Sequence, residues 1–204
     1  MERGAIILAG GRSRRFGDRD KVLAPLGDRP LIRHVLERVA PVVDSVTINC
    51  RMGQQAAITE AIGPWDSATQ FAIDPQDDHG PVMGIAAGLA ATDAPHVAVV
   101  ASDMPFVDPL VLRYLFVAIG EADAILPRPD EWFVPTQAVY RREGVLESMQ
   151  RAAEAGDKPI MAALEDAQTV SVDAAVLDRL DGHSSLQNIN TESELAAAAE
   201  AIDQ

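Results

Sequence analysis

The stretch AIILAGGRSRRFGDRDK, Ala5 to Lys21, decides the fold prediction. Its apolar run, residues 6–8, ends at Gly10 and Gly11, which is typical of a short buried strand followed by a tight turn. Basic residues then crowd the turn: Arg12, Arg14, Arg15, Arg19 and Lys21. Asp18 and Asp20 offset two of these five charges, so the segment keeps a local excess of three in a chain with a formal net charge of -14.

Working outward, apolar strand patterns alternate with amphipathic helix patterns along the chain. The predicted strands are residues 6–8, 45–50, 70–74, 97–101, 122–127, 133–141 and 169–173. The predicted helices are residues 29–43, 53–63, 85–94, 108–120, 144–156 and 188–202. Asp108 before Pro109 and Thr191 before Glu194 supply helix-start signals. This alternation predicts one α/β domain over residues 1–204: a doubly wound, mostly parallel sheet with helices on both faces.

The composition excludes several classes of protein. The 31 acidic against 17 basic residues argue against a nucleic-acid surface. Cys50 is the only cysteine, which rules out an internal disulfide and a cysteine-based zinc site. No apolar run reaches the roughly 20 residues of a membrane span, and no signal-peptide pattern is present, so we expect a cytoplasmic protein without a membrane partner. An acidic, lysine-poor composition is associated with proteins of salt-loving organisms, although solubility alone would also favour it.

Ligands of doubly wound sheets bind beyond the carboxyl ends of the strands. Residues 10–21 and Asp103 follow predicted strands, and Asn49 and Asp74 lie at the ends of two others. We therefore expect them to face one crevice.

The glycine-rich turn has the chemistry of a phosphate site. Glycines let backbone N–H groups approach oxyanions, arginines pair with phosphate oxygens in bidentate fashion, and Lys21 adds a compact charge. The spacing is neither G-x-G-x-x-G nor G-x-x-x-x-G-K-[ST], which disfavours a dehydrogenase and a P-loop ATPase. The alternative is a solvated loop in which the arginines pair with Asp18 and Asp20.

The polar residues at the other strand ends allow two interpretations each. Asp103 could hold Mg²⁺, which prefers carboxylate and phosphate oxygens, or cap a helix starting near Pro105. Asp74 could serve the same crevice or open a turn before Pro75, and Asn49 could bind a base or ribose or close a turn.

The segment HGPVMG leads into a predicted helix through Gly80, Pro81 and Gly84. A helix N-terminus at the crevice would favour an anionic or polar ligand, whereas the simpler alternative is an ordinary loop before a helix.

The stretch LAGGRSRRFGDRDKVL resembles the nucleotidylyltransferase signature L-A-G-G-x-S-x-R-M-G-x-x-K, and most closely that of the MobA-like molybdenum cofactor guanylyltransferases. The resemblance continues, in order, through GDRPLIRHVLERV, GPVMGI, ASDMPF, VPTQAVYRRE, AGDKPIM and NINTESEL. Departures are Phe16 for the usual Met, Ser102 for a frequent Cys, and a slightly longer spacer before Lys21. If the turn cannot absorb that spacer, the role of Lys21 is affected first.

The resemblance implies a Rossmann-like nucleotidyltransferase fold and a reaction. The terminal phosphate of molybdopterin cofactor attacks the α-phosphorus of GTP with Mg²⁺ present, releasing pyrophosphate and a guanine dinucleotide cofactor. It implies a nucleotide half over about residues 1–105 and an acceptor half over about 106–204, and transient contact with proteins that deliver or receive the cofactor.

The resemblance also assigns roles to residues. The catalytic set is Arg15, Lys21 and Asp103, with Asp103 as the metal ligand. The nucleotide-binding set is Leu8, Ala9, Gly10, Gly11, Lys21, Asn49, Asp74 and Asp103. The acceptor-binding set is Gly80, Pro81, Asn188 and Asn190.

Elementary electrostatics agrees with this reaction. Both substrates are polyanions, so positioning and charge neutralisation carry the transfer, and the attacking phosphate needs no general base because it is already ionised. The alternatives are a nucleotidylyltransferase that uses CTP or another phosphorylated acceptor, and a nucleotide-binding protein without activity.

Overall fold

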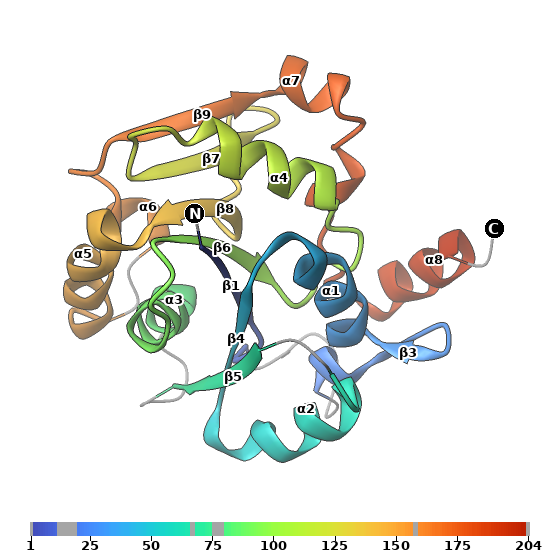
Figure 1. Ribbon diagram of the computed structural model, residues 1–204. Helices are drawn as coiled ribbons and strands as arrows, with labels where there is room; N and C mark the ends of the chain where they lie inside the picture. Colours follow the sequence, from blue (N-terminus) through green and yellow to red (C-terminus); the bar gives the residue numbers. More distant parts are fainter. Residues whose placement is uncertain (1, 12–19, 66–67, 75–79, 157–158, 203–204) are drawn as a thin grey trace.

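A seven-stranded sheet forms the centre of the molecule, with strand order β5-β4-β1-β6-β8-β7-β9 (Figure 1). The computed structural model describes residues 2–11, 20–65, 68–74, 80–156 and 159–202. The strands are β1 (Arg3–Leu8), β4 (Ser45–Cys50), β5 (Ala68–Ile73), β6 (His96–Ala101), β7 (Ala124–Arg128), β8 (Gln137–Arg141) and β9 (Thr169–Asp173). A separate two-stranded ribbon pairs β2 (Pro25–Leu26) with β3 (Arg29–Pro30).

The sheet is mostly parallel, which confirms the predicted fold class. Strand β1 pairs in parallel with β4 and β6, and the pairs β4–β5 and β7–β9 are also parallel. Within the described part of this seven-stranded sheet, only β8 runs antiparallel to its neighbours, β6 and β7. The carboxyl ends of β5, β4, β1, β6, β7 and β9 therefore meet at one edge of the sheet.

Helices cover both faces of the sheet, as predicted. The α-helices are α1 (Leu31–Val39), α2 (Gln55–Ile62), α3 (Gly80–Ala91), α4 (Pro109–Ala118), α5 (Arg142–Glu154), α6 (Ile160–Ala163), α7 (Ala174–Arg179) and α8 (Glu192–Ile202). Short 3-10 turns are η1 (Lys21–Leu23), η2 (Ala40–Val42), η3 (Met52–Gln54) and η4 (Ser184–Leu186). No helix within the described ranges is long and apolar enough to cross a membrane.

Alternating strand residues divide the core into two layers. In β1, Ala5 and Ile7 pack with α1, α2, α4 and α7, whereas Ile6 packs with α3, α5 and α6. A smaller apolar cluster, which includes Leu26 and Ile189, holds α8 against the β2–β3 ribbon. The C-terminal helix is thereby anchored beside the N-terminal half of the chain (Figure 1).

Three local differences from the sequence expectations have physical reasons. Helix α3 begins at Gly80, five residues earlier than predicted, because Pro81 suits the first turn of a helix. Strand β8 begins only at Gln137, since Pro135 has no N–H group for the ladder. Asp103 does not cap a helix near Pro105: residues 102–107 form turns, and α4 starts at Pro109.

Candidate functional site

The ends of three neighbouring strands lie level with one another. Leu8, the last residue of β1, is paired with Asn49 of β4 on one side and Ala101 of β6 on the other. The backbone N–H of Ala9 donates to the carbonyl of Asn49 at 2.8 Å, and that of Ser102 donates to the carbonyl of Leu8 at 3.0 Å. The segments after β1, β4 and β6 therefore start from one rigid edge.

Asn49 and Asp74 form a hydrogen-bonded pair at this edge. The side-chain amide of Asn49 donates to Oδ1 of Asp74 at 2.6 Å and to the carbonyl of Ala72 at 3.2 Å. Asn49 is only 2% exposed, whereas Asp74 is partly exposed. Asn49 thus fixes the orientation of the Asp74 carboxylate.

Two glycines allow this pair to form. A Cβ atom on Gly10 would lie 2.3 Å from Oδ2 of Asp74, and one on Gly84 would lie 2.2 Å from Oδ1 of Asn49. Both distances are far inside van der Waals contact, so any larger residue would push the pair apart. Gly10 and Gly84 are needed here for close approach rather than for an unusual backbone angle.

Lys21, Asp103 and Asn190 meet in a second cluster. Nζ of Lys21 lies 2.7 Å from Oδ2 of Asp103 and donates to Oδ1 of Asn190 at 3.1 Å. The side chains of Lys21 and Asp103 are 12% and 23% exposed. The backbone N–H of Ile189 also donates to the carbonyl of Asp103 at 2.8 Å, which seats the C-terminal segment on the turn after β6.

Asp103 has one carboxylate oxygen to spare. Its Oδ1 is buried and has no hydrogen-bond partner within the described part of the chain. No group of three or more His, Cys, Asp or Glu side chains suited to a metal occurs among those residues. One carboxylate is nevertheless enough for Mg²⁺ when phosphate oxygens and water complete its shell, so Asp103 fits a metal carried in with a nucleotide.

Asn190 is held in place by the start of α8. The backbone N–H groups of Asn190 and Thr191 donate to Oε2 of Glu194 at 2.5 and 3.0 Å, and the N–H of Glu194 donates to Thr191 Oγ1 at 3.2 Å. The hydrogen bond from the Asn190 backbone is the main cause that lowers the pKa of Glu194. The predicted capping box is therefore present and orients Asn190 toward Lys21.

Some predicted site residues are not brought into these clusters. Gly11 is exposed, and no atom of the other described residues lies within 4 Å of a Cβ built on it. Gly80 and Pro81 are exposed at the start of α3, and Asn188 is exposed as well. Arg15 lies outside the described residues.

Two residues that contact the site were missed from the sequence. Gln54 is buried and donates to the carbonyl of Ala9 and to the carboxylate of Asp20. In the sequence, Asp20 stands out only as a charge that offsets the arginines. Their positions in the sequence could have indicated them. Asp20 directly precedes Lys21, and Gln54 follows the end of β4 by four residues, at the same edge of the sheet as Asn49.

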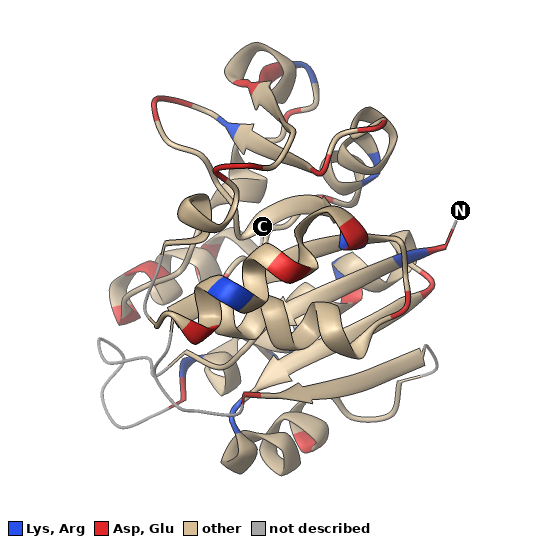
Figure 2. Ribbon diagram, turned by 90° about the vertical axis from the view of Figure 1, so that its left-hand side faces the viewer, with Lys and Arg blue, Asp and Glu red and all other residues tan. Residues whose placement is uncertain are grey.

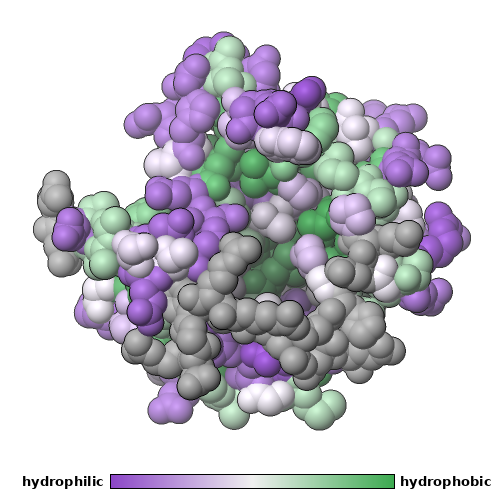
Figure 3. All heavy atoms as spheres, turned by 180° about the vertical axis from the view of Figure 1, so that it is seen from behind, coloured by the Kyte–Doolittle hydropathy of each residue, from purple (hydrophilic) through white to green (hydrophobic). Residues whose placement is uncertain are grey.

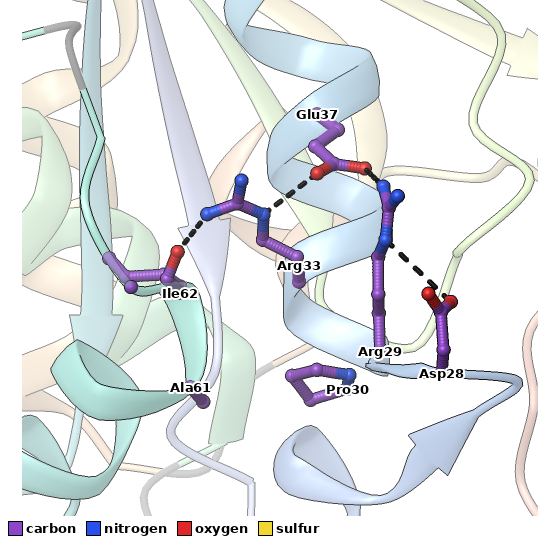
Figure 4. Close-up of a pocket in the computed structure, with 8 residues that line it drawn as sticks. Asp28, Arg29, Pro30, Arg33, Glu37, Ala61 and Ile62 are labelled. Atoms are coloured by element: carbon purple, nitrogen blue, oxygen red, sulfur yellow. Dashed lines mark hydrogen bonds and ion pairs between the residues drawn. The ribbon is translucent and has the colours of Figure 1, made fainter.

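A separate cavity of about 390 Å³ lies between the start of α1 and the end of α2 (Figure 4). Its two arginines are used internally: Arg29 and Arg33 contact Glu37 at 2.6 and 2.8 Å. Arg33 also donates to the carbonyl of Ile62 and stacks over Trp65 at 4.6 Å. This network joins α1 to α2 and is a structural feature rather than a phosphate site.

The molecule also has a hollow on the face seen from behind, with hydrophobic residues in its floor (Figure 3). Acidic residues are distributed over helices and loops around the outside (Figure 2). Lys21 is a cation in a predominantly acidic molecule. It contacts one oxygen of the Asp103 carboxylate, and the other oxygen accepts no hydrogen bond from the described residues. Such an arrangement is suited to a phosphorylated ligand that brings a divalent cation.

Comparison with known proteins identifies the family. The MobA-like NTP transferase domain family matches residues 5–170. Among similar chains are proteins named probable molybdenum cofactor guanylyltransferase from Natronomonas pharaonis, 39% identical with 98% of each chain covered, and from Haloferax mediterranei, 32% identical with 96% of this chain and 92% of the relative covered.

A solved structure extends the likeness to three dimensions. Molybdopterin-guanine dinucleotide biosynthesis protein A from Archaeoglobus fulgidus is similar with a TM-score of 0.81 and 28% identity, over 98% of each chain. The chain therefore belongs to the MobA-like NTP transferase family of nucleotidyltransferases.

Proposed function

We propose that this protein transfers GMP from GTP to the terminal phosphate of molybdopterin cofactor, with release of pyrophosphate. Two relatives bear the name of this activity, and the similar solved structure is named for the guanine dinucleotide product. The single observation that carries the proposal is the 2.7 Å contact between Lys21 and Asp103 at the carboxyl edge of the sheet.

In this proposal Lys21 neutralises phosphate charge. Its ammonium group is held between Asp103 and Asn190, so its position is set before a ligand arrives. A preorganised cation stabilises charge that develops on a leaving pyrophosphate without having to reorganise. The attacking phosphate is already ionised, so the chain needs to orient the two substrates rather than remove a proton.

Asp103 is the residue that would hold Mg²⁺. Oδ1 is the oxygen offered to the metal, while Oδ2 stays with Lys21. When bound, the metal would offset the negative charge of the phosphates. Asp103 would thereby hold the metal ion beside Lys21.

The two halves of the chain take different substrates in this proposal. Gly10, Asn49 and Asp74 belong to the nucleotide half, residues 1–105. Asn190 comes from the acceptor half, residues 106–204, and contacts Lys21 directly. In this proposal the triphosphate of GTP and the terminal phosphate of the cofactor therefore meet beside Lys21.

The proposal is tested by pyrophosphate release with each nucleoside triphosphate. We expect release with GTP, Mg²⁺ and molybdopterin cofactor together, and none when the cofactor is omitted. Preferred turnover with CTP or with another phosphorylated acceptor would replace the proposed substrates. Nucleotide binding without any release would identify an inactive binding protein.

A further inference from the structure

We propose that Gln54 is a positioning residue that fixes Lys21 by joining the two ends of the glycine-rich segment. The inference builds on the proposed function, because Lys21 is the phosphate-binding group in that proposal. Within the described residues, the hydrogen bonds of Gln54 reach the predicted nucleotide-binding set only at the backbone carbonyl of Ala9.

The amide of Gln54 is fully used. Its oxygen accepts from the backbone N–H of Arg51 at 2.9 Å and from Nε of Arg51 at 3.2 Å. Its nitrogen donates to the carbonyl of Ala9 at 3.2 Å and to Oδ2 of Asp20 at 2.5 Å. Gln54 is 6% exposed, so water does not readily replace these contacts.

The two acceptors of this nitrogen lie at opposite ends of the segment. Ala9 directly precedes Gly10, and Asp20 directly precedes Lys21. Oδ2 of Asp20 also lies 3.3 Å from Nη2 of Arg51, while its Oδ1 is buried without a partner in the described ranges. The Gln54 side chain, from η3, therefore links the residue that follows β1 to the residue that precedes η1.

Asp20 transmits this constraint to Lys21 through the backbone. The N–H of Leu23 donates to the carbonyl of Asp20, and the N–H of Ala24 donates to the carbonyl of Lys21, both at 3.0 Å. These bonds form η1, the turn from which the Lys21 side chain projects. Releasing Asp20 would loosen that turn, and a displacement of about 1 Å can cost about 100-fold in rate.

Gln54→Glu is the sharpest variant, because it keeps the shape and replaces the donor by an anion that faces the Ala9 carbonyl and the Asp20 carboxylate. We expect kcat/KM for GTP to fall about 10- to 100-fold. Gln55→Glu is the matched control: it adds the same charge at the next, exposed position. We expect it to retain the activity of the unsubstituted protein.

A double variant separates positioning from a general structural role. If Gln54 acts through Lys21, Gln54→Glu adds less than about a twofold loss to Lys21→Ala. Independent losses that multiply would overturn the inference, as would an unchanged kcat/KM in the single variant. Should Gln54→Glu not fold, Gln54→Met is measured identically: its apolar side chain of similar length removes the two donated hydrogen bonds together with the two that Gln54 accepts from Arg51.

Amide hydrogen exchange tests the contact without any nucleotide. We expect the N–H groups of Leu23 and Ala24 to exchange at least about tenfold faster in Gln54→Glu, with those of β6 unchanged. Adding Asp20→Asn should restore slow exchange, because the amide introduced at position 20 can donate to the carboxylate introduced at position 54. Unchanged exchange at Leu23 and Ala24 would overturn the inference. Absence of GTP turnover in the unsubstituted protein would instead overturn the proposed function, since exchange is read without turnover.

Discussion

Lys21 and Asp103 are 82 positions apart in the chain, yet their charged groups are in contact and mostly shielded from water. Removing two charges from water costs about as much as their attraction returns, so such a pair adds little to stability. An apolar pair would hold these segments together at least as well. The pair is more easily explained by the ligand that it is placed to bind.

Lys21→Ala tests this explanation at the level of one side chain. We expect kcat/KM for GTP to fall about 100- to 1,000-fold, equivalent to about 2.7–4 kcal/mol of transition-state stabilisation. Steady-state pyrophosphate release measures the loss, with Arg151→Ala as the control because Arg151 forms an exposed ion pair with Glu147, away from the site. Near-normal turnover would remove Lys21 from the mechanism.

Asp103→Asn tests the metal ligand. The amide keeps the size of the side chain and can still accept from Lys21, but it is a much weaker ligand for Mg²⁺. We expect the activity to be lost at a Mg²⁺ concentration that saturates the unsubstituted protein and to recover in part at higher Mg²⁺. A magnesium titration that matches that of the unsubstituted protein would contradict the assignment.

At the scale of elements, the sequence predicts the strand ends well. Each apolar run is followed by a glycine or a polar residue near the point where the strand ends: Gly10, Asn49 or Asp103. The parallel topology brings those strand ends together. The contacts within the site could not be predicted in the same way. That Asn49 turns toward Asp74, or that Gln54 reaches both Ala9 and Asp20, depends on side-chain directions and on the packing of helices far apart in the chain.

The strand pattern in the sequence also did not predict the antiparallel direction of β8. Residues 122–127 and 133–141 both read as buried strands, and periodicity does not encode direction. The structure explains the outcome through a short connection, since eight residues between β7 and β8 leave no room for a crossover helix. Loop length is therefore the signal that would have predicted it.

Asp123 holds this antiparallel region together. Its carboxylate accepts from the backbone N–H of Gln168 at 2.8 Å and forms an ion pair with Arg141. Burial raises the pKa of Asp123, but these hydrogen bonds outweigh burial and hold it below its usual value of 3.8. A lowered carboxyl pKa means that the stabilisation is present above about pH 4 and is lost as the pH falls further.

Asp123→Asn should therefore lower the free energy of unfolding by about 1–2 kcal/mol at pH 7. The difference from the unsubstituted protein should shrink between pH 4 and about pH 3, because Asp123 then takes up a proton more readily in the unfolded chain than in the folded protein. Urea unfolding at several pH values measures this, with exposed Glu147→Gln as the control. A difference that stays constant to pH 3 would mean that the carboxylate charge is irrelevant.

The whole molecule carries a formal net charge of -14, with acidic residues spread over its outside (Figure 2). Like charges repel in the compact state, and salt shortens the reach of this repulsion from about 10 Å at 0.1 M to about 3 Å at 1 M. We expect 1 M KCl to raise the melting temperature by at least about 2–4 °C, which corresponds to about 1 kcal/mol. A lower melting temperature in 1 M KCl would show that exposed ion pairs such as Arg29–Glu37 outweigh the repulsion.

The central claim is that Lys21 and Asp103 act on one magnesium–nucleotide complex. The most direct measurement is a crystal structure with Mg²⁺ and a GTP analogue that cannot release pyrophosphate. We expect the metal on Oδ1 of Asp103, with Nζ of Lys21 against the oxygens of the same triphosphate. A triphosphate bound away from both side chains would contradict the account.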